Sequence, residues 1–206
     1  MPDNLSGFKV AVIATHGVEE SEILEPIKAL RGAQADVKVL SIEPGEIQAF
    51  KHLEKGQKIK VDAVLDLGSA DDFDAVVFPG GAVNADHLRT HGLVKKFVLS
   101  FHRLSKPIAF ICHAPWILVS AGLTRGRTMT SYYTIMDDIV NAGGEWVDAE
   151  VVRDGNWVSS RQPTDLPAFN REMLAVFSEA YEEYFLTKPP PNDQRGLEKA
   201  STAPSR

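Results

Sequence analysis

The chain has 206 residues, of which 44% are hydrophobic and 24% charged, with a formal net charge of −6 and a single cysteine. This size and composition are those of one soluble globular domain with a substantial core. The negative charge argues against nucleic acid or an anionic membrane surface as the main partner, and one cysteine excludes an internal disulfide framework.

The N-terminal part alternates strand-type and helix-type patterns. Phe8–Ala14 is a nearly continuous apolar run that predicts a buried strand, and Glu20–Arg31 has apolar residues at helical spacing. Asp36–Ile42 predicts a second strand. In Lys58–Leu65, charged residues alternate with apolar ones, which predicts an edge strand or a hairpin.

The central part repeats this alternation. Asp74–Phe78 predicts a buried strand, followed by a Pro-Gly-Gly turn and a helix over Leu93–Leu104. Pro107–Ile111 is a further apolar strand, and the helix-compatible segment Ala114–Ala121 follows it closely. Strands that are apolar on both faces and alternate with helices predict a parallel sheet covered on both sides.

The C-terminal part predicts a short strand at Thr128–Ser131, a helix at Ile135–Ala142 and a hairpin within Trp146–Arg161, whose turn is Asp154-Gly155. Asp165–Phe185 predicts the last helix, with Asp165 as a candidate N-cap. Residues 188–206 are rich in proline and polar residues. We therefore expect a single domain over residues 1–187 and a disordered tail after it.

The start of the chain and its longest apolar run bear on localisation. The first residues, MPDNLSGFKVAVI, do not have the basic and long apolar regions of a signal peptide. The run Pro107–Leu123 contains His113, Pro115 and Ser120 and is too short for a membrane span. We therefore expect a cytoplasmic protein without membrane contact.

The strongest chemical signal is Cys112, which ends an apolar strand directly before a helix-compatible run. A strand that ends on a nucleophile and turns sharply into a helix is the geometry of a nucleophile elbow. The backbone amides of the following helix can lower the pKa of such a thiol. A lone cysteine in an apolar segment is more often a buried, inert core residue, so both interpretations stay open at this point.

A reactive thiol needs a group that accepts its proton or stabilises its charge. Of the six histidines, none follows His113, which argues against the downstream histidine of a class I glutamine amidotransferase. The base is therefore His113, an upstream histidine or a carboxylic acid. Adjacent residues across an elbow usually point apart, so His113 also has a plain structural reading as the start of a helix.

Two other strand ends carry candidate groups, and the carboxyl ends of parallel strands meet at one edge of a sheet. Gly80 and Gly81 follow the strand Asp74–Phe78, and the amide of Gly81 with that of His113 can form an oxyanion hole. Glu19, Glu20 and Glu22 open the first helix, either as solvated helix-end charges or with one buried as a protonated acid beside the thiol. The glycine-rich nucleotide and phosphate-loop patterns are missing, so no cofactor and no metal are expected.

Taken together, these segments resemble the PfpI family of intracellular cysteine proteases, within the superfamily of the parkinsonism-associated deglycase. The resemblance runs from FKVAVIATHGVEESE through DAVVFPGG and KPIAFICHAPWIL, and its most specific part is WVDAEVVRDGNWVSSR. It implies an α/β, flavodoxin-like three-layer sandwich with a mostly parallel sheet, of the glutamine amidotransferase-like class.

The resemblance also implies roles for single residues. Cys112 matches the elbow nucleophile, His113 the adjacent histidine, Glu22 the acid that contacts the thiol, and Gly81 an oxyanion donor. Asp86 falls where related proteins place an acid that reaches the histidine of a neighbouring subunit, often a glutamate, which is one methylene longer. A homo-oligomer with a shared active site is therefore expected.

The functional expectation is a stress-response cysteine hydrolase of the peptidase or glyoxalase/deglycase type. Its substrates would be peptides, or glyoxal-type aldehydes and their adducts on proteins. The alternative is a non-enzymatic redox sensor or chaperone-like stress protein, in which Cys112 is oxidised and stabilised by Glu22. The segment Gln48–Lys60 departs from the family's usual glycine-containing hairpin, so a different rim is expected there.

Overall fold

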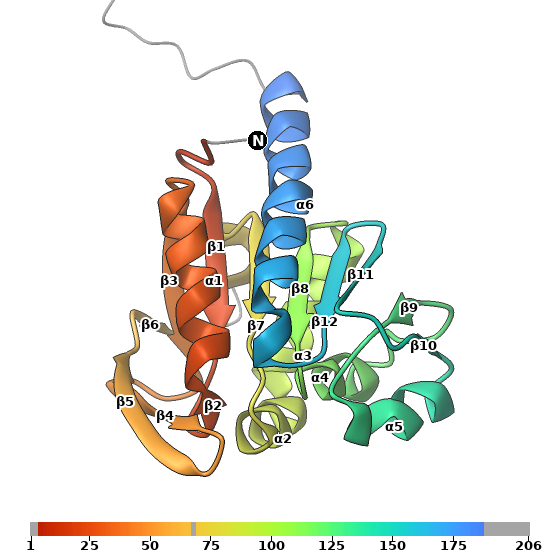
Figure 1. Ribbon diagram of the computed structural model, residues 1–206. Helices are drawn as coiled ribbons and strands as arrows, with labels where there is room; N and C mark the ends of the chain where they lie inside the picture. The colour runs from red at the N-terminus through yellow and green to blue at the C-terminus, as the bar shows by residue number, and fades with distance from the viewer. Residues whose placement is uncertain (1–3, 67–68, 188–206) are drawn as a thin grey trace, which may run out of the picture.

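The computed structural model describes residues 4–66 and 69–187, so the expected tail at residues 188–206 lies outside the described part. A central sheet and two smaller sheets organise this part (Figure 1). The strands of the central sheet are β1 (Lys9–Ile13), β3 (Asp36–Ser41), β6 (Ala63–Val64), β7 (Ala75–Phe78), β8 (Ile108–Ile111), β11 (Val151–Asp154) and β12 (Trp157–Ser160). The smaller sheets contain β2 (Val18–Glu19), β4 (Glu46–Lys51) and β5 (Glu54–Lys60), and β9 (Thr128–Met129) with β10 (Glu145–Trp146).

The central sheet has seven strands in the order β11-β12-β8-β7-β1-β3-β6. All neighbouring pairs are parallel except β11 with β12, which form the antiparallel hairpin predicted around Asp154-Gly155. This confirms the α/β class with a mostly parallel sheet. The order brings the ends of β1, β7 and β8 side by side, as the site hypothesis requires.

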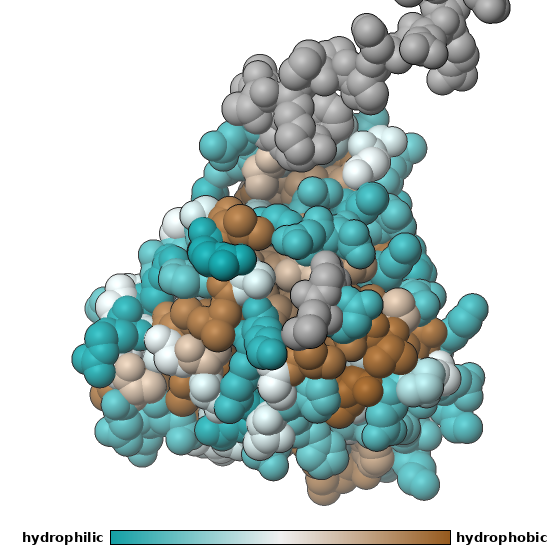
Figure 2. All heavy atoms as spheres, turned by 180° about the vertical axis from the view of Figure 1, so that it is seen from behind, coloured by the Kyte–Doolittle hydropathy of each residue, from teal (hydrophilic) through white to brown (hydrophobic). Residues whose placement is uncertain are grey.

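Helices cover the sheet on both faces, which makes the three layers visible in Figure 1. The helices are α1 (Glu20–Gly32), α2 (Ala82–Thr90), α3 (Gly92–Arg103), α4 (Pro115–Ser120), α5 (Met136–Asn141) and α6 (Leu166–Thr187), with 3₁₀ turns η1 (Ser69–Asp72), η2 (Tyr133–Ile135) and η3 (Pro163–Asp165). α1 and α6 pack on one face, and α2 to α5 contribute to the core on the other. Figure 2 views the molecule from behind, where apolar side chains reach the surface in separate patches between hydrophilic ones.

The sequence of strand β1 is almost continuously apolar because the strand is buried on both faces. Val10 and Val12 belong to the core under α1 and α6, whereas Ala11 and Ile13 belong to the core on the opposite face. Successive side chains of a strand point to opposite faces, so a strand buried on both sides has no polar face. Each fully buried aliphatic side chain contributes about 1.5–3 kcal/mol. No helix in the described ranges is long and apolar enough to cross a membrane.

Three local expectations change in the structure. Lys58–Leu65 is divided: its start belongs to β5 in the β4–β5 hairpin, and Ala63–Val64 forms the edge strand β6. The division falls at Asp62, whose carboxylate accepts a hydrogen bond from the Val39 amide instead of continuing a strand. The helix α2 was not predicted, because only three of its residues are buried and its apolar periodicity is weak. Asp165 directly precedes α6, but its carboxylate binds the Arg161 guanidinium.

Candidate active site

Cys112 lies at a sharp turn between β8 and α4. Its φ is +64°, a left-handed conformation that is strained by about 1–3 kcal/mol in a residue other than glycine. Its amide donates to the carbonyl of Ser160 on the neighbouring strand β12, at 3.0 Å. The turn holds the cysteine side chain at the end of the sheet, in the elbow geometry predicted from the sequence.

A cavity of about 760 Å³ opens over this turn. Its walls come from the loop after β1, the start of α1, the β4–β5 hairpin, the turn after β7, and residues 162–164. Cys112 is 7% exposed and lines the cavity with His113, Glu22 and Gly81. Four of the five predicted site residues therefore meet in one place.

Glu22 is fully buried beside the cysteine. One carboxylate oxygen, Oε2, accepts a hydrogen bond from the Gly80 amide at 3.0 Å, while Oε1 has no hydrogen-bond partner within the described part of the chain. Burial, together with the negative charge of Glu19, raises the pKa of the Glu22 carboxyl to about 8, against the opposing effect of the Cys112 thiol and the Gly80 amide. Glu22 is therefore protonated near neutral pH.

The thiol of Cys112 is also kept in its protonated form at rest. Burial and the negative charge of ionised Glu22 raise the pKa of the Cys112 thiol. Hydrogen bonds from the amides of Gly81 and His113 lower that pKa, as expected for an elbow, but they do not outweigh burial. A base must therefore remove the proton when the thiol reacts.

His113 is within reach of that proton. Although neighbours across an elbow usually point apart, its Nδ1 lies 3.1 Å from the Cys112 sulfur. Burial lowers the pKa of His113, which favours the neutral, basic imidazole. The other ring nitrogen, Nε2, lies 3.4 Å from the hydroxyl of Thr134, and the ring stacks on Tyr132 at 5.0 Å between centroids. When Nδ1 accepts the thiol proton, Nε2–H donates to Thr134.

Gly81 brings its amide to the sulfur at the N-terminus of α2. Its φ is +88°, and a side chain there would collide with the carbonyl oxygen of Gly17 and approach the Glu19 amide to 2.8 Å. Only glycine fits this turn without strain. The amides of Gly81 and His113 both donate to the cysteine sulfur, which puts two hydrogen-bond donors beside the reacting atom.

The two other acids near the site, Asp86 and Glu20, do not line the cavity. Asp86 is exposed on α2, outside the residues that line the cavity, and no contact in the described chain joins it to His113. Its expected reach into a neighbouring subunit stays a prediction. Glu20 holds the β4–β5 hairpin, since its carboxylate accepts from the Gln57 amide at 2.6 Å and pairs with Lys51 at 3.4 Å.

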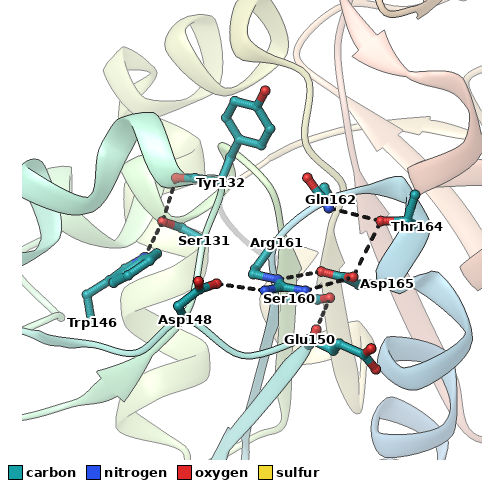
Figure 3. A network of polar contacts seen from close by, with 10 residues as sticks. All are labelled: Ser131, Tyr132, Trp146, Asp148, Glu150, Ser160, Arg161, Gln162, Thr164 and Asp165. Carbon is teal, nitrogen blue, oxygen red and sulfur yellow. Dashed lines mark hydrogen bonds and ion pairs between the residues drawn. The ribbon is translucent and has the colours of Figure 1, made fainter.

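The polar network in Figure 3 fixes the wall of the cavity at residues 162–164. The Arg161 guanidinium donates to Asp148 at 2.6 Å and to Asp165 at 2.8 Å. The side-chain amide of Gln162 donates to Thr164 at 3.0 Å. This network lies in and beside the most specific segment of the resemblance, where the residue types alone gave no sign of a cavity wall.

Sequence reasoning assigned no site role to several other residues near the thiol. These are Gly80, Thr134 and the tip of the β4–β5 hairpin, where Leu53 is 95% exposed and lines the cavity with Phe50. The departure of Gln48–Lys60 from the family pattern was the only signal for this rim. In the residues that the structure describes, no group of three or more His, Cys, Asp or Glu side chains could hold a metal ion.

Comparisons with known proteins found related sequences and a related fold. Residues 8–176 match the model of the DJ-1/PfpI family. Deglycase PfpI of Pyrococcus furiosus is 42% identical over 169 residues, which cover 82% of this chain and 99% of that protein. General stress protein 18 of Bacillus subtilis is 40% identical over 171 residues, covering 82% and 98%. The crystal structure of Drosophila melanogaster DJ-1beta has a TM-score of 0.76 at 28% identity and covers 88% of this chain and 97% of that one.

Proposed function

The chain belongs to the DJ-1/PfpI family, and on this premise we propose that it is a stress-related hydrolase. Cys112 is the nucleophile, and the substrates are glyoxal-type aldehydes or their adducts on proteins. One observation supports this most directly: the thiol lies at the floor of a cavity with a neutral base 3.1 Å away, a protonated acid and two amides around it. These groups are the nucleophile, base, acid and oxyanion donors of carbonyl chemistry.

The reaction begins when His113 Nδ1 accepts the thiol proton. The sulfur then forms a bond to the aldehyde carbon, and the π electrons of the carbonyl move to its oxygen. The amides of Gly81 and His113 donate to that oxygen, and the protonated Glu22 supplies a proton to it. This step needs no oxidant or reductant.

A 2-oxoaldehyde continues to a stable product. The hydrogen on the sulfur-bearing carbon leaves as a proton to Glu22 and returns to the neighbouring carbonyl carbon. The hydroxyl proton of the sulfur-bearing carbon passes to the oxygen of that neighbouring carbonyl, so that the product is a thioester with a 2-hydroxyl group. Water hydrolyses the thioester and restores the thiol. The balance is 2-oxoaldehyde plus water giving a 2-hydroxy acid. For an adduct, the carbon–nitrogen or carbon–sulfur bond breaks first: the amine or thiol leaves with the bonding electrons and the hydroxyl proton, and the aldehyde that Cys112 attacks is regenerated.

A small carbonyl substrate fits the site better than a folded peptide segment does. Peptide hydrolysis needs an open groove and a histidine fixed by an acid. Cys112 is 7% exposed at the cavity floor, and His113 faces Thr134 rather than an acid of its own chain. Peptidase activity therefore depends on an acid supplied by a second copy.

The second candidate is a redox sensor. The observation in its favour is the buried, unpartnered Oε1 of Glu22, which in its protonated form could donate to an oxidised sulfur. The raised pKa of the Cys112 thiol works against it, because the thiolate is the form that peroxide oxidises.

The deciding experiment measures turnover of methylglyoxal and of a fluorogenic peptide, and the intact mass after mild peroxide. We expect methylglyoxal turnover that Cys112→Ala abolishes and that Ser100→Ala, on α3 outside the cavity lining, retains. Addition of oxygen at Cys112 without turnover of either substrate would reject the hydrolase and support the sensor. Turnover that survives Cys112→Ala would reject both.

A further inference from the structure

The charges that line the cavity are unevenly distributed. Its lining residues include two acids, Glu19 and Glu22, and three histidines, but neither lysine nor arginine is among the lining residues that the structure describes. Glu22 is neutral near pH 7, since burial raises its pKa to about 8. Glu19 is then the carboxylate that sets the sign of the cavity's charge.

Glu19 is held against the cavity by the hairpin. Its side chain is 12% exposed, and Oε2 accepts a hydrogen bond from the His52 amide at 2.9 Å. Its other oxygen forms no hydrogen bond within residues 4–66 and 69–187. A carboxylate that is largely removed from water and lacks a full set of donors attracts a cation more strongly than one in bulk water.

The histidines do not cancel this charge. His16 Nδ1 accepts a hydrogen bond from the Gln48 amide at 3.0 Å, so this ring nitrogen is engaged by the β4–β5 hairpin. Burial keeps His113 neutral by lowering its pKa. His52 Nδ1 is 4.0 Å from Glu19, but the His52 side chain is 83% exposed, so solvent screens any charge on it.

We propose that Glu19 determines specificity by favouring substrates that carry an ammonium or guanidinium group beside the reacting carbonyl. An adducted arginine side chain keeps a guanidinium-type cation, and an unmodified lysine or arginine next to an adduct supplies one. Glu22, on the same cavity wall, is fully buried and neutral near pH 7, so it leaves the charge of Glu19 unopposed. The proposal rests on the proposed function in one respect, because it takes Cys112 as the reacting group.

Two charged thiol reagents test the proposal without any assumption about turnover. Cationic trimethylammonioethyl methanethiosulfonate and anionic sulfonatoethyl methanethiosulfonate react alike: the thiolate forms a mixed disulfide and releases methanesulfinate. Cys112 is the only cysteine in the chain, so intact mass reports its modification directly. The ratio of the two rates cancels any change in the thiolate fraction.

The variants are Glu19→Gln, which retains an oxygen for the His52 amide, and Glu25→Gln, which removes an exposed charge from α1, the helix that follows Glu19. At pH 6.5 Glu22 is protonated in all three proteins, because burial is the larger cause of its raised pKa. We expect the cation-to-anion rate ratio to fall about 3- to 10-fold in Glu19→Gln and to stay unchanged in Glu25→Gln.

A cation-to-anion rate ratio that does not change in Glu19→Gln would overturn the proposal. An equal fall of this ratio in Glu25→Gln would also overturn it, because any negative charge on the protein would then have the same effect as Glu19. The outcome is separate from that of the proposed function. A shifted ratio with no methylglyoxal turnover would keep the cation preference and reject the hydrolase. Methylglyoxal turnover with an unchanged rate ratio would support the hydrolase and reject the cation preference.

Discussion

Glu22 couples the stability of this protein to pH. Its pKa of about 8 in the folded chain lies above the ordinary value of a glutamate, 4.5. The folded chain therefore keeps a proton that the unfolded chain releases between these values, and the free energy of unfolding falls as the pH rises through this window. Below pH 4.5 the contribution of this group is fully present.

Glu22→Gln should remove this dependence, because glutamine is neutral and retains an oxygen for the Gly80 amide. We expect its free energy of unfolding at pH 8 to exceed that of the wild type by roughly 2–4 kcal/mol, and to match it near pH 4.5. Urea denaturation across this range measures the difference. Glu25→Gln, which changes an exposed carboxylate, is the control, and the same pH-dependent gain there would refute the assignment to Glu22.

At the scale of elements, the turn between β7 and α2 packs against two buried residues of the site, Cys112 and Glu22. A Cβ atom on Gly80 would lie 2.5 Å from the Cβ of Cys112 and 2.9 Å from the carbonyl oxygen of Ile111, and would collide with the Glu22 carboxylate. These neighbours are buried and cannot move away cheaply. The glycine is therefore required by close approach.

Gly80→Ala should destabilise the fold by about 2–4 kcal/mol and speed alkylation of Cys112 several-fold, because moving Glu22 away from the thiol removes one cause of the raised pKa of that thiol. Thermal unfolding and iodoacetamide labelling measure the two effects. Gly92→Ala is the matched control: a Cβ there meets nothing within 4 Å. Similar behaviour of the two variants would show that the turn tolerates a side chain.

The Arg161 network should act on substrate binding more than on the chemical step. The Arg161 guanidinium holds Asp165 and Asp148, and its bonds to both raise the pKa of Arg161. Arg161→Lys loses the planar fork that binds Asp165 through two nitrogens, so we expect about 1–2 kcal/mol of destabilisation and a several-fold higher KM.

Steady-state kinetics with unchanged kcat would support this role for the wall at residues 162–164. Arg153→Lys provides the comparison, since Arg153 also binds a carboxylate, Glu179, but at an exposed position remote from the cavity. We expect it to leave KM unchanged. A similar rise in KM for both variants would mean that the effect is a general loss of stability.

At the scale of the whole molecule, the open question is whether one copy completes the site of another. Asp86 is exposed on α2, and His113 has no acid partner in its own chain as described. We propose that Asp86 reaches His113 of a second copy in a homo-oligomer. An acid there would orient the ring and stabilise its protonated form.

A mixing experiment tests this directly. Cys112→Ala lacks the nucleophile and Asp86→Asn lacks the acid, so each should lose peptidase activity by tenfold or more. Mixed oligomers would contain one complete site, and we expect activity to return after subunit exchange. No recovery from a mixture that sedimentation shows to be co-assembled would place Asp86 outside the site.

Much of the fold was predictable because burial on both faces leaves a plain pattern in the residue order. The strands around Val10, Val76 and Ala109 are apolar throughout, and the turn at Asp154-Gly155 is explicit. The helix α2 was missed, because a helix with few buried side chains carries a weak apolar repeat.

The candidate site was predictable as a set of residues but not as a chemical state. Cys112, Gly81 and Glu22 follow from strand ends and the family resemblance. The contact of His113 with the sulfur depends on the φ of Cys112, and the partner Thr134 comes from a distant turn. Neither leaves a local signal in the sequence.

By itself, the sequence determined the parallel α/β class, the position of the elbow and the family, because these depend on local periodicity and on residue types in order. Only the tertiary structure decided the state of the site. The protonation of Glu22 and Cys112 depends on how completely distant segments exclude water from them. The negative cavity wall at Glu19 likewise exists only because the β4–β5 hairpin folds against α1.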